Sequence, residues 1–327
     1  MVAGTGESGL LLSENALTVL RRRYLRRDAD GNPIETPQDM FRRVAQNIAS
    51  ADAAYGATEA EVAGRADEFY GVMAKGDFMP NSPTLMNAGR DFQQLSACFV
   101  LPVEDSMESI FDAVKNTAMI HKSGGGTGFS FSRLRPKDDI VNSTQGVSSG
   151  PLSFMQVFDA ATEAIKQGGR RRGANMGVLR VDHPDIEKFI ALKEKDGFLG
   201  NFNISVAITD EFMEAVAADG DFALRFEGKT YKTVKAKTLW QSIIDHAWAN
   251  GEPGLLFIDA VNRYNPTPHV GEFEATNPCV TGDTLVATPK GNRRADSFNV
   301  GDEVTTALGT TGEVENIEVH NDMDVYE

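Results

Sequence analysis

The sequence predicts an α/β protein with a helical N-terminal region, a largely parallel sheet and a short β-rich C-terminal segment. Apolar residues recur at helical spacing over the first 80 residues. From Pro80 onward, short apolar strands alternate with capped helices, which is typical of a parallel α/β sheet. After Pro278 the helical spacing ends, and short β-type runs separated by turns follow. We therefore expect three parts, residues 1–80, 81–278 and 279–327.

Two helices of the first part are marked by their opening residues. Thr36 offers an N-cap, followed by a proline at the first helical position and an acid, Asp39, in the first turn. Thr58 and Glu61 form a capping-box pair, and the helix that they open stops at Gly76.

In the second part, apolar runs predict strands and capped amphipathic runs predict helices. Asp105 and Glu108 are expected to cap a helix that follows the first strand. Because ligands of parallel α/β sheets bind at the carboxyl ends of the strands, we expect a site there. The strands are expected over residues 97–103, 129–131, 176–181, 202–208, 222–226 and 255–258, and further helices over 151–166, 185–195, 210–218 and 238–250.

Composition excludes several classes of protein. The formal net charge of −15 disfavours DNA as a partner. Neither a run of about 18 apolar residues nor a basic leader is present, so we expect no membrane association and a cytoplasmic location. Two cysteines, Cys98 and Cys279, do not make a disulfide scaffold. The histidines show no metal-ligand spacing, so no metal site is expected.

Two glycine-rich stretches, residues 123–128 and 167–175, are neither a Walker loop nor a dinucleotide fingerprint. Glycine-rich loops are most often plain connections, but the three arginines at 170–172 suit a phosphate. Cys98 lies in a strand that we expect to be buried, where a structural thiol is the more common outcome.

Four segments resemble the large chains of ribonucleotide reductases. They are QLSACFVLPVEDSM at 94–107, KSGGGTGFSFSRLRP at 122–136, RRRGANMG at 170–177 and EATNPC at 274–279. The last three of these segments are similar to the adenosylcobalamin-dependent, class II branch in particular. The resemblance runs in matching order from about Ser13 to Pro278.

This resemblance implies a ten-stranded α/β barrel, of which the chain supplies the helical region and about the first half. It also implies the roles of individual residues. The substrate ribonucleotide would be lined by Ser82, Ala97, Cys98, Gly126 and Asn277. A deoxynucleoside triphosphate effector would be bound by Asp105, Ser106, Met107 and Arg135. The specificity loop between the two would consist of Gly168, Gly169, Arg170, Arg171, Arg172 and Gly173, running to Asn175.

The chemistry that the resemblance implies is reduction of ribonucleotides by a thiyl radical. Adenosylcobalamin generates the radical, which removes the 3′ hydrogen of the ribose. A cysteine pair then supplies two electrons and closes to a disulfide, which thioredoxin or a similar dithiol reopens. Cys98 matches one member of that pair, and Asn277 matches the residue that orients the substrate hydroxyls. A homodimer is a further implication.

Cys279 has two competing interpretations. In the reductases the motif continues with Gly-Glu, and its cysteine carries the radical. Here Val280-Thr281-Gly282-Asp283-Thr284 follows, which resembles the start of an intein of the Hint family. As an intein residue, the Cys279 thiol would attack the Pro278 carbonyl and convert an amide into a thioester. The intein interpretation is favoured, and the fragment is then expected to be inactive alone.

Three alternatives stay open. The chain could belong to a class I reductase large subunit, which works with a separate iron subunit. Residues 279–327 could act as one half of a trans-splicing intein. The half-barrel could bind an effector without catalysis. The sequence leaves undecided whether diphosphates or triphosphates are reduced, and whether the intein carries an endonuclease.

Overall fold

The computed structural model describes Leu10, residues 12–141, 145–166, 173–194 and 197–277, and four short strands between 285 and 313. The chain divides after Ala97 into two compact units, and each is described by itself. Among the described residues, no helix is long and apolar enough to cross a bilayer.

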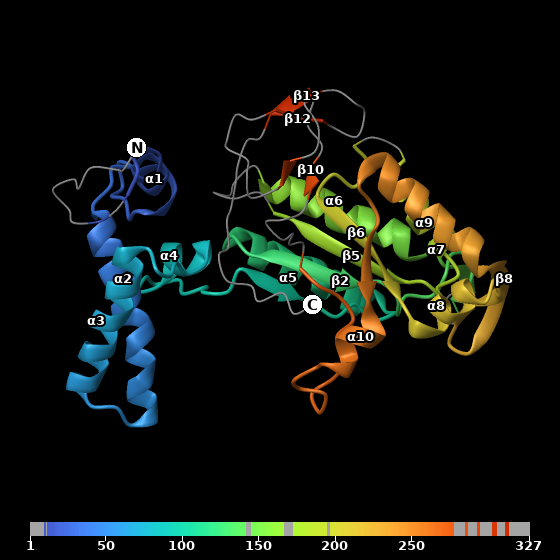
Figure 1. Ribbon diagram of the computed structural model, residues 1–327, viewed down its shortest axis with the longest axis horizontal. Coiled ribbons are helices and arrows are strands. Elements are labelled where there is room, and N and C mark those ends of the chain that lie inside the picture. Colours follow the sequence, from blue (N-terminus) through green and yellow to red (C-terminus); the bar gives the residue numbers. More distant parts are fainter. Residues whose placement is uncertain are drawn as a thin grey trace. The chain divides into compact units, whose positions relative to one another are not determined.

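The first unit is helical, and its helices are drawn in blue and cyan in Figure 1. Its apolar core gathers around Met40, Phe41 and Val44 of the second helix and Met73 of the third. Its elements are α1 (Glu14–Val19), a π-helical turn η1 (Leu20–Tyr24), α2 (Pro37–Ala49), a 3₁₀ turn η2 (Ser50–Tyr55), α3 (Glu59–Lys75) and α4 (Ser82–Asn87).

Both capping boxes expected in this unit are confirmed. The Thr36 hydroxyl accepts from the Asp39 amide, and the Asp39 carboxylate accepts from the Thr36 amide. Thr58 and Glu61 make the same reciprocal pair at the start of α3. The helix ends where Gly76 turns into the left-handed region at φ 76°, a conformation that glycine adopts without a steric penalty.

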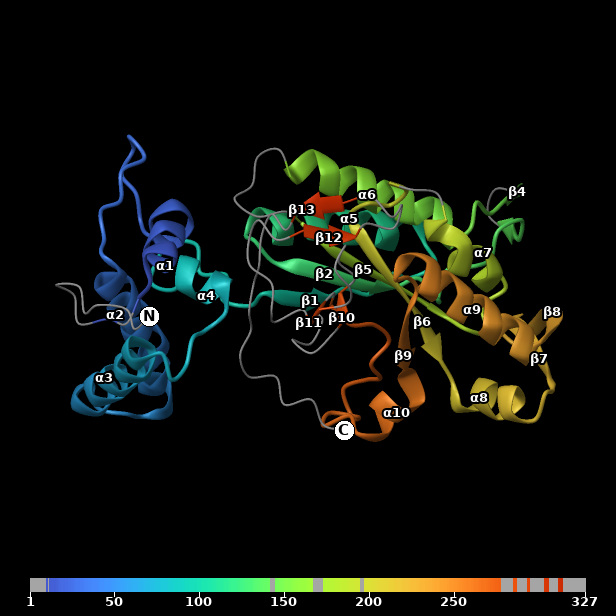
Figure 2. The same ribbon diagram turned by 45° about the horizontal axis from the view of Figure 1, so that its top comes forward.

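The second unit contains a five-stranded parallel sheet in the order β1-β2-β5-β6-β9. Each crossover between neighbouring strands carries helices, as parallel pairing requires. Figure 2 shows α5, α6 and α9 running along the sheet. The strands are β1 (Cys98–Val100), β2 (Gly126–Ser130), β5 (Asn175–Arg180), β6 (Phe202–Ile208) and β9 (Gly254–Phe257). The helices are α5 (Met107–Lys122), α6 (Pro151–Lys166), α7 (Ile186–Ile190), α8 (Asp210–Ala217), α9 (Ala236–Asn250) and α10 (Ile258–Arg263).

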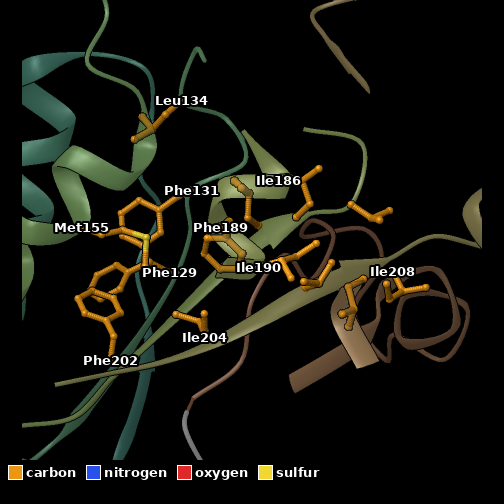
Figure 3. Packing of buried hydrophobic residues seen from close by; sticks show 14 of the residues in the cluster. Phe129, Phe131, Leu134, Met155, Ile186, Phe189, Ile190, Phe202, Ile204 and Ile208 are labelled. Atoms are coloured by element: carbon orange, nitrogen blue, oxygen red, sulfur yellow. The ribbon is translucent and has the colours of Figure 1, made fainter. Parts of the chain in front are cut away.

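One face of this sheet is the main hydrophobic core. Phe129 of β2 packs against Phe158 of α6, with ring centroids 4.7 Å apart, and Phe131 meets Phe158 edge-on at 5.6 Å. Residues of α5, α7, α8 and α9 complete the same cluster. Figure 3 shows the aromatic rings beside Met155, with the isoleucines of α7 and β6 continuing the row. This face is therefore the helix-covered face.

The opposite face of the sheet has a much smaller apolar cluster. It consists of Met176 and Val178 of β5, Ala207 of β6, Ile258 of α10 and Ala275 of the segment after α10. Alternate residues of a strand point to opposite faces, so β5 contributes its even-numbered residues here and Leu179 to the main core. We call this second face the inner face of the sheet.

The structure differs from the sequence prediction in several places. The helix expected over 185–195 is only α7, followed by a 3₁₀ turn, Ala191–Lys193. The strand expected over 97–103 is only Cys98–Val100. The hydroxyl of Ser106, rather than the carboxylate of Asp105, caps α5 by accepting from the Ser109 amide at 3.1 Å. The strand expected at 222–226 is β7 (Asp221–Phe226), which pairs antiparallel with a strand that was not expected, β8 (Lys229–Lys235).

Three further pairs of short strands complete the description. A hairpin of β3 (Ile140–Val141) and β4 (Gly146–Val147) lies within the second unit. Beyond Asn277, β10 (Leu285–Val286) pairs with β11 (Arg293–Arg294), and β12 (Glu303–Thr305) pairs with β13 (Thr311–Glu313), both antiparallel.

Candidate active site

Cys98 lies at the amino end of β1, directly across the ladder from Gly126 at the start of β2. A Cβ on the neighbouring Gly125 would meet Ile120 and Phe99, so residues 99 and 125 point to the helix-covered face. Cys98 and Gly126 therefore lie on the inner face. Cys98 is exposed, and the expectation of a buried thiol is wrong. The physical reason is that β1 is an edge strand and that, among the described residues, Cys98 belongs to neither apolar cluster of the sheet.

Asn277 lies against Gly126 on this inner face. A Cβ at Gly126 would come within 3.2 Å of the Asn277 Nδ2 atom and 3.3 Å of its Oδ1 atom. Ala275, 6% exposed and packed in the inner cluster, anchors the segment that carries Asn277. The structure thus brings together three residues that lie far apart in the sequence, namely Cys98, Gly126 and Asn277.

Gly128 is a further residue of this arrangement that the sequence prediction did not single out. A Cβ at Gly128 would overlap the carbonyl oxygen of Thr276. Only a glycine therefore lets the segment 274–277 pass this closely over β2. The signal was present in the sequence, because glycine inside a strand often marks the close approach of another backbone.

These residues lie at the amino ends of the parallel strands. Cys98 and Gly126 are the first residues of β1 and β2, and the segment ending at Asn277 runs over β2. The rule that places ligands at the carboxyl ends of parallel strands therefore misplaces this site. The site lies at the amino edge because the segment 274–277 crosses β2 there. The pattern of strands in the sequence does not reveal this crossing.

Ser82 and Ala97 belong to the first unit, whereas Cys98, Gly126 and Asn277 belong to the second. Within the first unit, the Ser82 hydroxyl lies 2.8 Å from the phenolic oxygen of Tyr24, the last residue of the π-helical turn. Arg90 donates to the backbone carbonyl of Tyr24 at 2.8 Å and so helps to fix it. Ala97 is half-buried.

The four residues expected at the effector site gather around the start of α5. The Arg135 Nε donates to the Asp105 carboxylate at 2.6 Å, and the Arg135 amide donates to it at 3.3 Å. Ser106 caps the helix, and Met107, its first residue, is 60% exposed. An arginine beside a helix N-terminus is an arrangement that suits an anion.

Of the expected specificity loop, Gly168 to Arg172 lie outside the described residues, as does Cys279, whereas Gly173 is described and buried. A Cβ at Gly173 would meet the imidazole of His121. His121 starts a buried chain of hydrogen bonds that the sequence prediction missed. Its Nε2 lies 2.9 Å from the Thr127 hydroxyl, which donates to Asn175 at 2.7 Å, and Asn175 donates to Thr162 at 2.9 Å.

This chain fixes the protonation state of His121. Because the Thr127 hydroxyl donates to Asn175, it accepts from the imidazole, so Nε2 carries the proton. Burial lowers the pKa of His121 to about 4, although a hydrogen bond with the Ala174 backbone acts in the opposite direction. The ring is therefore neutral at physiological pH. In the described parts of the chain, no group of three or more His, Cys, Asp or Glu side chains is arranged to hold a metal ion.

Comparison with known proteins agrees with a helical unit followed by a parallel α/β unit. A family model for the ribonucleotide reductase barrel domain matches residues 96–281, and one for the all-alpha domain matches residues 10–93. A vitamin B12-dependent ribonucleoside-diphosphate reductase from Thermoplasma acidophilum is 48% identical over 83% of this chain and 42% of its own length. One from Mycobacterium tuberculosis is 46% identical over 83% of this chain and 39% of its own. A ribonucleoside-diphosphate reductase subunit alpha from Helicobacter pylori is 32% identical over 80% and 36%.

The helical unit, the five-stranded parallel α/β sheet and the cysteine on its inner face define an α/β protein with a candidate thiol site. The chain belongs to the ribonucleotide reductase large-chain family. It spans about two fifths of the length of the curated relatives that it matches.

Proposed function

We propose that this chain is the N-terminal part of an adenosylcobalamin-dependent ribonucleotide reductase, which converts ribonucleotides into deoxyribonucleotides for DNA synthesis. The observation that carries the proposal is the meeting of Cys98, Gly126 and Asn277 on the inner face of the sheet. The names of relatives at 46–48% identity, which state dependence on vitamin B12, support the choice of cofactor. Thioredoxin or a similar dithiol would be the reductant.

Each residue of the site has a role in this proposal. Gly126 leaves room for a ribose, because a side chain there would press on Asn277. The Asn277 amide orients the substrate hydroxyls, and the exposed Cys98 thiol reaches the substrate from β1. Cys98 and a second cysteine from the missing part supply two electrons and two protons. The 2′ hydroxyl leaves as water, and the two sulfurs join in a disulfide. Ser82 and Ala97 are proposed to contact the same nucleotide.

The adenosylcobalamin, when bound, supplies the radical that begins the reaction. The described residues fit this chemistry, because the sheet presents an exposed thiol on its inner face, away from the main hydrophobic core. We assign the binding of the corrin to the part of the protein beyond this chain. The contribution of this chain is to hold the ribonucleotide and to deliver the electrons of Cys98.

The start of α5 is proposed to bind a deoxynucleoside triphosphate that selects the substrate. Arg135, positioned by Asp105, would meet phosphate oxygens, and Ser106 and the exposed Met107 would line the rest of the site. Gly168 to Gly173 would relay the identity of the effector to the substrate. The protein is proposed to be cytoplasmic and to work as a homodimer.

The test is to supply the C-terminal part that relatives have and this chain lacks, and to assay deoxynucleotide formation with adenosylcobalamin and a dithiol. We expect product without any second protein subunit. Absence of product contradicts the proposal. Product that requires a separate iron subunit instead of adenosylcobalamin supports the class I alternative, which the subunit alpha relative keeps open.

A second function is proposed for residues 279–327, the start of an intein that interrupts the reductase after Pro278. Two observations favour it. The family match to the barrel domain ends at residue 281, and short antiparallel strand pairs follow between 285 and 313. Cys279 would then form the thioester with Pro278, and the radical cysteine of the reductase would follow the intein.

Splicing is tested by co-expression of this chain with a C-terminal partner that carries the remaining intein and reductase. We expect a ligated product on a denaturing gel, and its loss in Cys279→Ala because the alanine cannot attack the Pro278 carbonyl. Ligation that persists in Cys279→Ala contradicts the intein. If the separate parts do not ligate but a single chain that contains both does splice, the intein is continuous and not a trans-splicing half.

A further inference from the structure

We propose that His183 and Asp185 are positioning residues for Arg135. They hold the backbone on both sides of this arginine, so that its guanidinium stands at the start of α5 where a deoxynucleoside triphosphate binds. This inference rests on the effector site proposed above and adds to it two buried residues from the turn after β5.

The first contact holds the carbonyl that precedes Arg135. The imidazole Nε2 of His183 lies 2.9 Å from the backbone oxygen of Leu134. Both partners are buried, with His183 2% and Leu134 1% exposed. Water therefore does not replace this hydrogen bond if it is broken, and the Leu134 carbonyl would be left without its partner in an apolar setting.

The second contact holds the amide two residues after Arg135. The backbone N–H of Lys137 donates to the Asp185 carboxylate at 2.8 Å, and Asp185 is 5% exposed. The two contacts thus fix the chain at Leu134 and at Lys137, with Arg135 between them. With the backbone held on both sides, Asp105 accepts from the Arg135 amide and sets the direction of its guanidinium.

We call His183 and Asp185, with their two contacts to the chain around Arg135, the brace. It also sets the protonation state of His183. The Asp185 amide donates to His183 Nδ1 at 3.1 Å, so the proton of the neutral ring is on Nε2 and points at Leu134. The edge of the ring meets Phe226 of β7 at a centroid distance of 5.9 Å. Burial lowers the pKa of His183, while the Leu134 carbonyl and the carboxylates of Asp185 and Asp182 act in the opposite direction.

The geometry explains why such a brace is useful for binding an anion. The Arg135 guanidinium already makes a 2.6 Å hydrogen bond to Asp105 and lies 3.3 Å from the Ile140 carbonyl. An arginine recognises a phosphate through donors in a fixed planar arrangement. A backbone shift at 134–137 would therefore move all the donors of Arg135 together and weaken phosphate binding.

The experiment titrates the full 327-residue chain with dATP by calorimetry, at one fixed protein concentration. Two variants remove the brace, His183→Leu and Asp185→Ala. Two conservative variants, His183→Gln and Asp185→Asn, keep these contacts. Glutamine retains an N–H donor for the Leu134 carbonyl, and asparagine retains a carbonyl acceptor for the Lys137 amide. We expect binding to weaken about tenfold in the first two and to change by less than about threefold in the others.

Hydrogen exchange gives a readout that does not depend on binding. Loss of the Asp185 acceptor should speed exchange of the Lys137 amide by about tenfold. The Val62 amide, which donates to the Thr58 carbonyl in the other unit, should be unchanged. His246→Leu is the matched histidine control, since His246 makes its hydrogen bonds to Ser242 and Glu194. We expect it to bind dATP like the unmodified chain.

The outcomes separate this inference from the proposal beneath it. An unmodified chain that fails to bind dATP overturns the effector site, and the positioning role falls with it. An unmodified chain that binds, together with unchanged binding in His183→Leu and Asp185→Ala, overturns the positioning role alone. If His183→Leu does not fold, Asp185→Ala and the exchange of the Lys137 amide decide.

Discussion

The backbone of Thr276 occupies the space that a side chain at Gly128 would need. This relationship fixes where the segment 274–277 crosses the sheet, and it places Asn277 beside Gly126. The crossing is on the inner face, while Thr127, between the two glycines, points to the helix-covered face and meets His121. Gly126 and Gly128, at alternate positions of β2, thus leave the space that the segment 274–277 occupies in the candidate site.

Substitution of Gly128 by alanine should displace Asn277 while sparing the fold. The added methyl group overlaps the Thr276 carbonyl, so the segment must lift away and carry Asn277 with it. Misplacement of a reacting group by about 1 Å can cost about a hundredfold in rate. In the protein completed with its C-terminal part, we expect Gly128→Ala to lower deoxynucleotide formation by about that factor.

Gly64→Ala provides the matched control. Gly64 lies in α3, and an added Cβ there has no heavy atom within 4 Å. Alanine in a helix should raise the melting temperature slightly, because it stabilises helices by roughly 0.5–1 kcal/mol relative to glycine. Full activity in Gly128→Ala would show that the segment does not need this close approach.

The exposure of Cys98 predicts that its thiol reacts in the native chain. In a Cys279→Ser background, so that Cys98 is the only thiol, we expect Ellman's reagent to modify about one thiol per native chain within minutes. A saturating ribonucleoside diphosphate should slow this reaction, because the substrate covers the inner face beside Gly126. Equal rates in native chain with and without nucleotide would contradict the proposed position of the substrate.

Much of the fold could be predicted because local signals and tertiary structure agree. The caps at Thr36 and Thr58 and the strand at 202–208 occur where the sequence places them. The position of the site could not be predicted in the same way. It depends on a segment near residue 276 crossing a strand near residue 128, and no local pattern encodes a contact over that distance in the sequence.

The exposure of Cys98 was mispredicted for a related reason. Its run of apolar neighbours predicts a buried strand, which is correct for the helix-covered face only. Phe99 meets the helix side, whereas Cys98 and Val100 point to the inner face, where Val100 is 51% exposed. Similarly, aspartate is a favourable N-cap residue, which is why Asp105 was expected to cap α5. Its carboxylate pairs with Arg135 instead, and Ser106 caps the helix.

The pair of Asp105 and Arg135 predicts the behaviour of the effector site. Arg135→Ala removes the guanidinium that would meet phosphate, and Asp105→Ala leaves the guanidinium without its orienting partner. Hydrogen bonds to charged groups contribute roughly 1.5–3 kcal/mol, so affinity for deoxynucleoside triphosphates should fall by about tenfold or more in either variant. Calorimetry with the four triphosphates measures the change.

Asp112→Ala is the matched control for the effector site. Asp112 also lies in α5 and pairs with Lys115 at the surface, with both side chains more than half exposed. Such exposed pairs contribute little, and we expect binding in this variant to match that of the unmodified chain. An equal loss in Asp112→Ala and Asp105→Ala would point to the general charge of α5 instead of a specific site.

His121 predicts an acid-dependent loss of stability. Its pKa is lowered by burial from 6.5 to about 4 in the folded chain, against the opposing hydrogen bond with Ala174. Between these two pH values the unfolded chain binds a proton that the folded chain does not, so the free energy of unfolding falls as the pH falls from 6.5 toward 4. One pKa unit corresponds to about 1.4 kcal/mol, so the full loss from this group reaches about 3 kcal/mol.

Urea denaturation at several pH values measures this dependence, with His121→Gln as the comparison. Glutamine can keep a donor for Thr127 but does not titrate, so its curve should be flatter than that of the unmodified chain between pH 6.5 and about 4.5. The structural carboxylates Asp39 and Glu61, whose pKa values are lowered mainly by hydrogen bonds from the Thr36 and Thr58 amides, lose their contribution only at lower pH. Parallel curves for the two proteins would mean that His121 is not held neutral by the buried chain of Thr127, Asn175 and Thr162.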